Sequence, residues 1–267
     1  MPRSCKIDPA CRQRGFSLIE LMISVTIGLV VLAAVLYIYS GNRQGNRAQE
    51  LSARMLDSGR FALEIIGHSI REAGFADLSS AESSFKASFA GTPVTGTNGA
   101  LGAPDVITLQ RDGAVNDRGC LGTVVTPAMI TAAGGNVIIQ ESFNLDTVNN
   151  ALRCDEQIAA APGAVANGTA LISDVEDFQV LYGLDTTGDQ SADQYTATPA
   201  NWNQVVSARV CLQLRSSEAG AVTGNQTFLN CAGALSGSGA TTTTTDRRLH
   251  RVFLATYNLR NRVTNLP

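Results

Sequence analysis

The sequence predicts an α+β protein in which a long N-terminal helix packs on an antiparallel β-sheet domain. Two observations support this prediction. An apolar run followed by an amphipathic repeat occupies the first part of the chain, and short segments of alternating apolar and polar residues follow it. Because several short strands with polar connections favour antiparallel pairing, we expect one or two sheets laid against the amphipathic half of the helix.

The apolar run predicts a single membrane-spanning helix. It reads FSLIELMISVTIGLVVLAAVLYIY over residues 16–39, and Glu20 is its only charged residue. At about 1.5 Å per residue the run is roughly 36 Å long, enough to cross the ~30 Å hydrocarbon core. A helix pairs its own backbone groups, as lipid requires. We therefore assign residues 16–40 to the transmembrane half of the helix.

The residues ahead of the run form a short basic leader, 1–15. A secretory signal peptide is cut after its apolar region, whereas here the small residue Gly15 stands before it. Positive residues that flank a span stay in the cytoplasm, so we expect the leader inside and the residues after about 40 outside. The leader's charged residues are Arg3, Lys6, Asp8, Arg12 and Arg14.

The residues after the run predict a second, amphipathic half of the same helix, 41–75. Gly74 suits its C-cap, so we expect one helix from about Ser17 to Ala73, roughly 85 Å long. The remaining residues, 76–267, are predicted to form a β-rich globular domain. The apolar stripe at spacings of four and seven consists of Leu51, Met55, Ala62, Ile66 and Ile70.

Alternating apolar residues between polar connections predict the strands of this domain. Residues 76–104 indicate an irregular connection. Residues 216–248 are low in complexity, and we expect them to be mobile wherever no disulfide restrains them. The strands are expected at Val106–Leu109, Gly122–Thr126, Val137–Gln140, Val175–Tyr182, Val205–Arg215 and His250–Leu259.

Composition and motifs argue against two classes of function. The net charge is −3 with a pI near 5.4, so no basic surplus points to nucleic acid. His68 and His250 are the only histidines, and the chain has no H-E-x-x-H, G-x-S-x-G or P-loop motif. We therefore expect neither an enzyme nor a nucleic-acid-binding protein.

Cysteines on the outer, oxidising side predict two disulfides. Cys5 and Cys11 belong to the leader. Four cysteines permit three connectivities, and we favour the two that close local loops; buried free thiols are the alternative. The four are Cys120, Cys154, Cys211 and Cys231, paired as Cys120–Cys154 and Cys211–Cys231.

One polar loop has the oxygen spacing of a calcium site. It runs from Asp185 through Thr187 and Asp189 to Asp193. It lacks the EF-hand glycine, because Gln190 stands there, and the final glutamate. A polar hairpin turn is the alternative, and we expect no cofactor apart from this weak calcium candidate.

The start of the helix resembles a known processing signature. Gly15-Phe16-Ser17-Leu18-Ile19-Glu20 ahead of an apolar helix resembles the N-terminus of type IV prepilins and type II secretion pseudopilins. The resemblance implies that a membrane-embedded prepilin peptidase cuts between Gly15 and Phe16 and N-methylates Phe16. It further implies that Glu20 compensates the charged amino terminus of a neighbouring subunit, a reason to keep a costly charge in lipid.

Three further segments resemble the PilW-like minor pilins: residues 58–75, 177–189 and 247–262. The resemblance implies a type IV pilin-like fold, anchored in the bacterial inner membrane with its C-terminal domain in the periplasm. It implies a minor pilin that primes assembly at the pilus tip and supports twitching motility and adhesion. The implied partners are other minor pilins, the major pilin, membrane lipid and the inner-membrane assembly platform. A J-type minor pseudopilin of type II secretion is the alternative.

Overall fold

The computed structural model describes residues 15–77, 89, 91–99, 103–161, 163 and 168–261. The leader cysteines Cys5 and Cys11 lie outside these residues. The chain divides into two units, 1–47 and 48–267, and each is described by itself.

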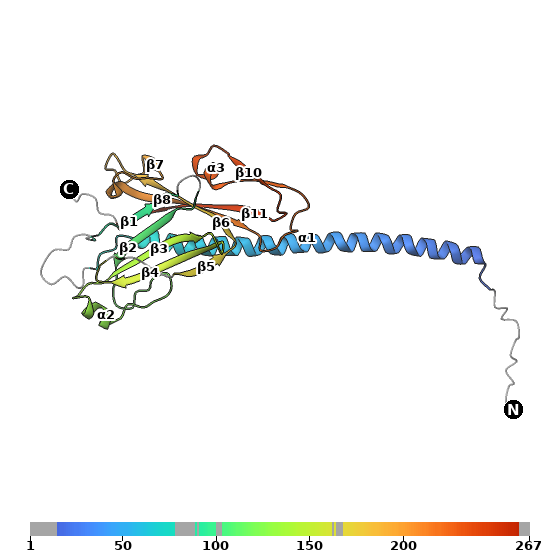
Figure 1. Ribbon diagram of the computed structural model, residues 1–267, viewed down its shortest axis with the longest axis horizontal. Coiled ribbons are helices and arrows are strands. Elements are labelled where there is room, and N and C mark those ends of the chain that lie inside the picture. The colour runs from blue at the N-terminus through green and yellow to red at the C-terminus, as the bar shows by residue number, and fades with distance from the viewer. Residues whose placement is uncertain are drawn as a thin grey trace, which may run out of the picture. The chain divides into compact units, whose positions relative to one another are not determined.

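A 55-residue helix, α1 (Leu18–Glu72), belongs to both units (Figure 1). It begins and ends within one residue of the predicted bounds. Gly74 follows it with φ of 79°, and the Gly74 N–H donates to the carbonyl of Gln110 at 2.8 Å. This left-handed conformation is the usual helix C-terminus. In the second unit α1 buries Leu51, Met55, Gly59, Ala62, Ile66, Gly67, Ser69 and Ile70, which include the whole predicted stripe.

The second unit contains a five-stranded sheet whose strands follow one another in sequence and in space, all antiparallel. Consecutive antiparallel strands pair without a crossover connection, so this sheet is a meander. Its strands are β1 (Val94–Thr97), β2 (Val106–Asp112), β3 (Ile138–Asp146), β4 (Ala151–Ala159) and β5 (Thr169–Ser173).

A second, four-stranded antiparallel sheet has the order β11-β8-β6-β7. Its central strands β6 and β8 are the long alternating segments of the sequence, and β11 lies at one edge. The strands are β6 (Val175–Leu184), β7 (Gln194–Thr196), β8 (Val205–Arg215) and β11 (His250–Asn258).

Short elements complete the second unit. Two of them, β9 (Gln226–Leu229) and β10 (Thr241–Thr244), pair as a separate two-stranded ribbon. In the described part of this unit, three short helices accompany the strands: α2 (Pro127–Ala132), the 3-10 helix η2 (Trp202–Gln204) and α3 (Cys231–Ser236).

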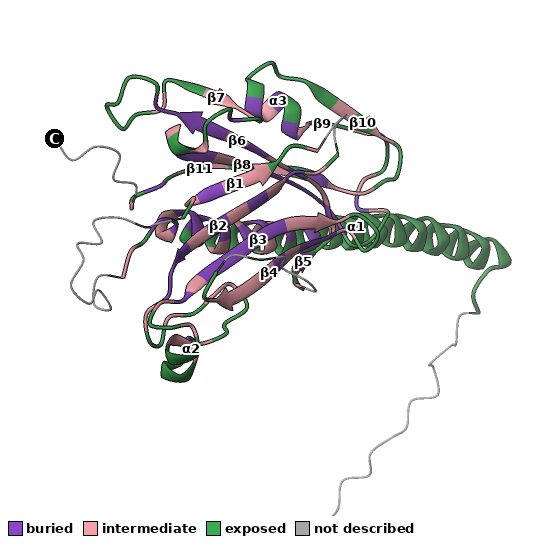
Figure 2. Ribbon diagram, turned by 60° about the vertical axis from the view of Figure 1, so that its left-hand side comes forward, coloured by how far each residue is buried: buried purple, intermediate pink, exposed green. Residues whose placement is uncertain are grey.

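The core of the second unit lies where α1 meets both sheets. Figure 2 shows buried residues along the inner strands and on one side of this half of α1. Ile66 and Ile70 of α1, Phe143 of β3 and Phe178 of β6 are fully buried in one apolar cluster. The apolar stripe of the helix is therefore the element that joins the two sheets.

Some sequence-based predictions of elements are wrong. Gly122–Thr126 is a loop with one isolated bridge, Arg118 to Val124. Its two consecutive valines favour a strand, but no described strand pairs with them beyond this bridge. The low-complexity segment 216–248 contains β9, α3 and β10, and the connection 76–104 contains β1. The patterns in the sequence also did not predict α2, β4, β5 and β7.

Candidate functional site

The start of α1 holds the residues of the predicted processing and assembly site. Gly15, Phe16 and Ser17 precede the helix. The backbone N–H of Ser17 donates to Glu20 Oε2 at 3.0 Å, which is one half of a capping box. The Glu20 carboxylate also lies in the first turn, where the helix dipole favours a negative charge. Glu20 therefore caps its own helix.

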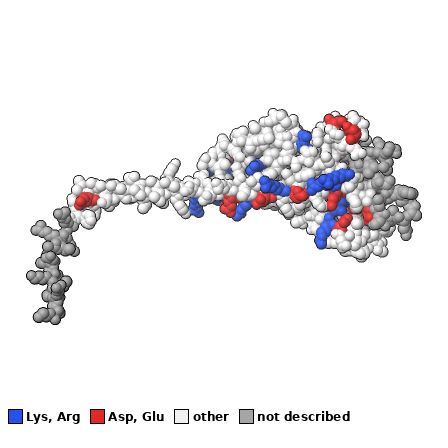
Figure 3. All heavy atoms as spheres, turned by 180° about the vertical axis from the view of Figure 1, so that it is seen from behind, with Lys and Arg blue, Asp and Glu red and all other residues white. Residues whose placement is uncertain are grey.

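The surface of α1 behind Glu20 is apolar. Its hydroxyl groups bond within the helix: Ser24 Oγ donates to the carbonyl of Glu20 at 2.7 Å, and Thr26 Oγ1 to that of Ile23 at 2.9 Å. In Figure 3 this stretch carries charged atoms only near its start. It is the one helix of the described residues long and apolar enough to cross a membrane, and none of that segment is buried.

The four cysteines of the second unit lie far from this site in the sequence. They pair as Cys120–Cys154 and Cys211–Cys231, the two local loops favoured above. Cys211 and Cys231 are fully buried and pack with Leu235. The second bridge thereby ties α3 to the centre of β8.

Asp185 begins the loop that resembles a calcium site. Its Oδ1 accepts hydrogen bonds from the Thr187 N–H at 3.2 Å and the Gly188 N–H at 2.6 Å, and its Oδ2 accepts one from the Gln190 N–H at 2.8 Å. Desolvation raises the pKa of Asp185, but these hydrogen bonds outweigh it and leave the pKa below its ordinary value.

Asp193 closes the same loop. Its Oδ2 accepts hydrogen bonds from Thr186 Oγ1 and the Thr186 N–H, both at 2.7 Å, and from the Thr187 N–H at 3.1 Å. The bonds from Thr186 hold the pKa of Asp193 below its ordinary value. Asp189 Oδ1 accepts the Ser191 N–H at 2.9 Å. The loop's carboxylates thus organise its backbone.

A second cluster escaped the sequence analysis. His250 is buried at the start of β11, with Nδ1 2.8 Å from Glu176 Oε2 and Nε2 3.0 Å from Asp246 Oδ1. Among the described residues these three are the group with metal-ligand spacing. Glu176 and Asp246 contact opposite nitrogens of the His250 ring. A single metal ion bound to one ring nitrogen would therefore not take the place of both contacts. Arg215 pairs with Glu176 at 3.5 Å, and Phe228 stacks on His250. The group is a polar cluster around the buried His250, and the stacking of Phe228 joins β9 to it.

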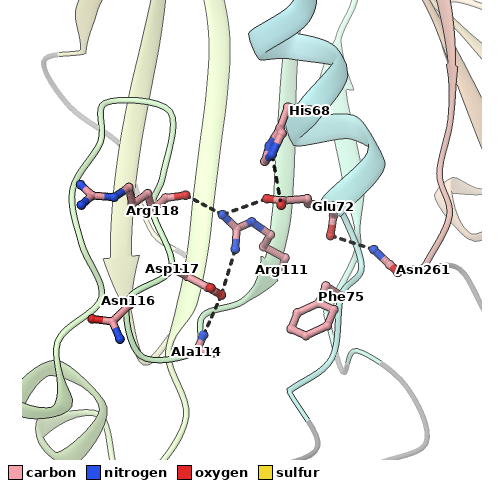
Figure 4. A pocket seen from close by; sticks show the side chains of 9 residues that line it. All are labelled: His68, Glu72, Phe75, Arg111, Ala114, Asn116, Asp117, Arg118 and Asn261. Atoms are coloured by element: carbon pink, nitrogen blue, oxygen red, sulfur yellow. Dashed lines mark hydrogen bonds and ion pairs between the residues drawn. The ribbon is translucent and has the colours of Figure 1, made fainter.

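A cavity of about 440 Å³ lies where the end of α1 meets β2 (Figure 4). Arg111 crosses it: Nη2 lies 3.1 Å from Glu72 Oε2 and donates to the Arg118 carbonyl at 2.7 Å, and Nη1 lies 3.4 Å from Asp117 Oδ2. His68 lies 3.4 Å from Glu72. Because the arginine already binds protein groups, this is a structural network that locks α1 to the sheet.

Comparisons with known proteins match both ends of the chain. Residues 138–261 match the family model described as Type IV Pilus-assembly protein W, and residues 11–36 match the Prokaryotic N-terminal methylation motif. A search of curated proteins gives no match. The chain is therefore PilW-like over residues 138–261 and carries the N-terminal methylation motif at its start.

Solved structures extend this conclusion to the fold. The PilW-like chain is similar to a type IV-like pilin from Thermus thermophilus, with 14% identity and a TM-score of 0.53 over 79% of this chain and 98% of that one. The fold is therefore type IV pilin-like. A binary complex of two pseudopilins from the type 2 secretion system of Vibrio vulnificus gives 15% identity over 62% of this chain and 86% of the matched chain. Its TM-score of 0.36 does not establish a common fold.

Proposed function

We propose that this chain is a minor pilin of the type IV pilus that helps prime assembly at the filament tip, and so supports twitching motility and adhesion. One combination carries the proposal: a prepilin motif at Gly15–Glu20 opens an apolar helix, and a PilW-family region follows in the same chain. Family and fold are those of pilins, which are structural proteins.

The first step is removal of the leader. Prepilin peptidase cuts between Gly15 and Phe16 and methylates the new amino terminus of Phe16. Both residues lie ahead of the first helical residue, and Phe16 is 88% exposed. A peptide bond outside a helix is open to a protease, which supports cleavage at this point.

The processed chain is held in the inner membrane by residues 16–40, with the second unit in the periplasm. Basic residues in the leader support this orientation. The two disulfides also support it, because disulfides persist in the bacterial periplasm.

Assembly then moves the apolar half of α1 from lipid into the filament, with the assembly platform, other minor pilins and the major pilin as partners. The apolar half of α1 loses its contact with lipid, and packing against the helices of the other pilins offsets this loss. The Glu20 carboxylate pairs with the charged amino terminus of a neighbour, which offsets the cost of a charge in an apolar environment.

Mass spectrometry of the mature protein tests the first step. The expected N-terminal residue is N-methylated Phe16. An intact Met1, or cleavage inside the apolar run, would contradict the proposal, because either would leave a conventional anchor or a signal peptide.

Deletion of the gene tests the assembly role and separates it from the alternative. We expect loss of surface pili and of twitching with protein export unchanged. A J-type pseudopilin would give the opposite result, with export lost and piliation retained.

A further inference from the structure

The outer edge of β11 is open. β11 pairs with β8 on one side, and no described strand pairs with it on the other. An open edge presents unpaired backbone N–H and C=O groups to any extended segment that approaches.

The hydrogen-bond pattern identifies which groups are free. The Leu259 N–H donates to the Val206 carbonyl at 2.9 Å. Hydrogen-bonded residues alternate along an antiparallel ladder, so every second residue back from Leu259 bonds to β8. The backbone groups of Val252, Leu254 and Thr256 therefore point away from β8.

Gln226 occupies the first position of this edge. Its Oε1 accepts the His250 N–H at 2.8 Å, and its Nε2 donates to the His250 carbonyl at 3.1 Å. The Gln226 amide thus bonds to His250 as a neighbouring strand would. Beyond it, the described part of the chain supplies no such partner to the next three outward-facing residues.

An apolar hollow lies beside the open positions. It has a volume of about 330 Å³ and is lined mainly by side chains of β9, α3 and β11. Two of them are large and exposed, Leu229 at 42% and Leu254 at 46%. In an added strand every second side chain points to this face, so apolar residues at alternate positions would cover the hollow.

Two arginines flank the open edge. Arg251 lies on β11, with its guanidinium carbon 5.9 Å from the centre of the Phe253 ring, and Arg260 lies just after the strand. Neither arginine forms an ion pair with a described carboxylate. A strand with acidic side chains would supply the missing partners.

We propose that the outer edge of β11 is a docking site for an extended strand of a different subunit, one whose side chains alternate between apolar and acidic. Backbone bonds would give affinity, and the hollow and the arginines would give specificity. A second copy of this chain fits less well, because it would add two more arginines to the interface. The identity of the partner as a filament subunit rests on the proposed function; the binding chemistry does not.

Hydrogen–deuterium exchange on the full chain in detergent micelles tests the site. The probe is a blocked seven-residue peptide alternating valine and glutamate, with a matched valine–lysine peptide. Before addition, the amides of 252, 254 and 256 should exchange at least tenfold faster than those of 253, 255 and 257. The glutamate peptide should slow them and bind at least tenfold more tightly than the lysine peptide.

Variants separate backbone pairing from side-chain contact. Leu254→Pro removes an outward N–H at an edge, where proline is tolerated, and should abolish the slowing. Leu254→Ala keeps that N–H and should retain the slowing of exchange. Arg251→Glu should lower affinity for the glutamate peptide at least tenfold and raise it for the lysine peptide.

Three results would overturn the proposal: equal exchange at even and odd positions, peptide binding that leaves 252, 254 and 256 unchanged, or edge protection that appears only as the chain dimerises with concentration. The proposed function is tested separately by the N-terminal residue, so either idea can fail alone.

Discussion

At the residue scale, two glycines let α1 and β11 approach closely. A Cβ built on Gly59 would lie 2.7 Å from the ring of Phe253, and one on Gly67 would overlap the ring of Tyr257. Tyr257 Oη also donates to the carbonyl of Leu63 at 2.8 Å. The close contact between helix and strand therefore depends on Gly59 and Gly67 having no side chain.

Gly67→Ala should destabilise the second unit by about 1–3 kcal/mol, because the Tyr257 ring must leave its position. Thermal unfolding of the purified full chain measures the loss. Gly45→Ala is the matched control: no atom lies within 4 Å of its added Cβ, and alanine favours a helix by up to about 1 kcal/mol. Equal effects at both positions would contradict the packing argument.

Glu141 makes stability depend on pH. Burial raises the pKa of Glu141, and hydrogen bonding to Ser69 and the charge of Arg111 oppose this only in part. A carboxyl whose folded pKa is raised favours unfolding once pH exceeds its unfolded pKa of about 4.3. Its cost therefore grows from that pH up to the folded pKa and then stays constant.

Relative to wild type, Glu141→Gln should therefore have a more favourable effect on the free energy of unfolding at neutral pH than at pH 4. Denaturant unfolding of both proteins at both pH values measures this difference. Glu50→Gln is the control, since Glu50 and Arg54 form an exposed pair, which contributes little. A difference between Glu141→Gln and wild type that is the same at both pH values would refute this prediction.

At the element scale, long local patterns predicted their elements, whereas strands that depend on neighbouring strands were not predicted. α1 follows from spacing within its own sequence, and β6, β8 and β11 alternate over many residues. β4 mixes charged residues with apolar ones, and pairing with β3 and β5 is what makes it a strand. No local pattern encodes that tertiary contact.

The Cys211–Cys231 bridge should be a main source of stability for α3 and the adjoining ribbon. Closing a 20-residue separation contributes about 3 kcal/mol in chain-entropy estimates. Replacing both cysteines by alanine should lower the free energy of unfolding by about that amount. The control replaces Cys5 and Cys11 by serine, which should leave the processed protein unchanged. A bridge variant as stable as wild type would contradict the prediction.

The 185–193 turn should be stable without calcium, because Asp185 and Asp193 already accept hydrogen bonds from its backbone. We expect Asp193→Asn to lower the melting temperature equally in calcium and in EDTA. The loss should be largest at neutral pH and disappear as pH falls through the lowered pKa of Asp193. A calcium-induced rise in wild-type melting temperature that Asp189→Ala removes would instead support a metal site.

At the scale of the whole molecule, the motif at the start of α1 could be predicted and the buried polar clusters could not. Gly15–Glu20 is contiguous, so one sequence suffices to recognise it. His250 and Glu176 are 74 positions apart, and only the pairing of β8 with both β6 and β11 brings them together. Sequence reasoning treated His250 as a strand residue for that reason.

The Glu20 carboxylate has two separate roles. It accepts the Ser17 N–H and so caps its own helix, and in the proposed filament it neutralises a neighbour's amino terminus. Glutamine can perform the first role, because capping boxes accept Glu or Gln at this position. Glutamine cannot perform the second, because it has no charge. The two roles therefore predict different outcomes for one substitution.

Glu20→Gln should leave cleavage at Gly15 and membrane insertion intact but reduce the number of surface pili as strongly as Glu20→Ala does. Immunoblots and N-terminal mass spectrometry check processing, and electron microscopy counts filaments. Glu50→Ala, which removes an exposed carboxylate of the second unit, should leave the filament number unchanged. If Glu20→Gln assembles as wild type while Glu20→Ala does not, helix capping rather than charge neutralisation is what assembly requires of this residue.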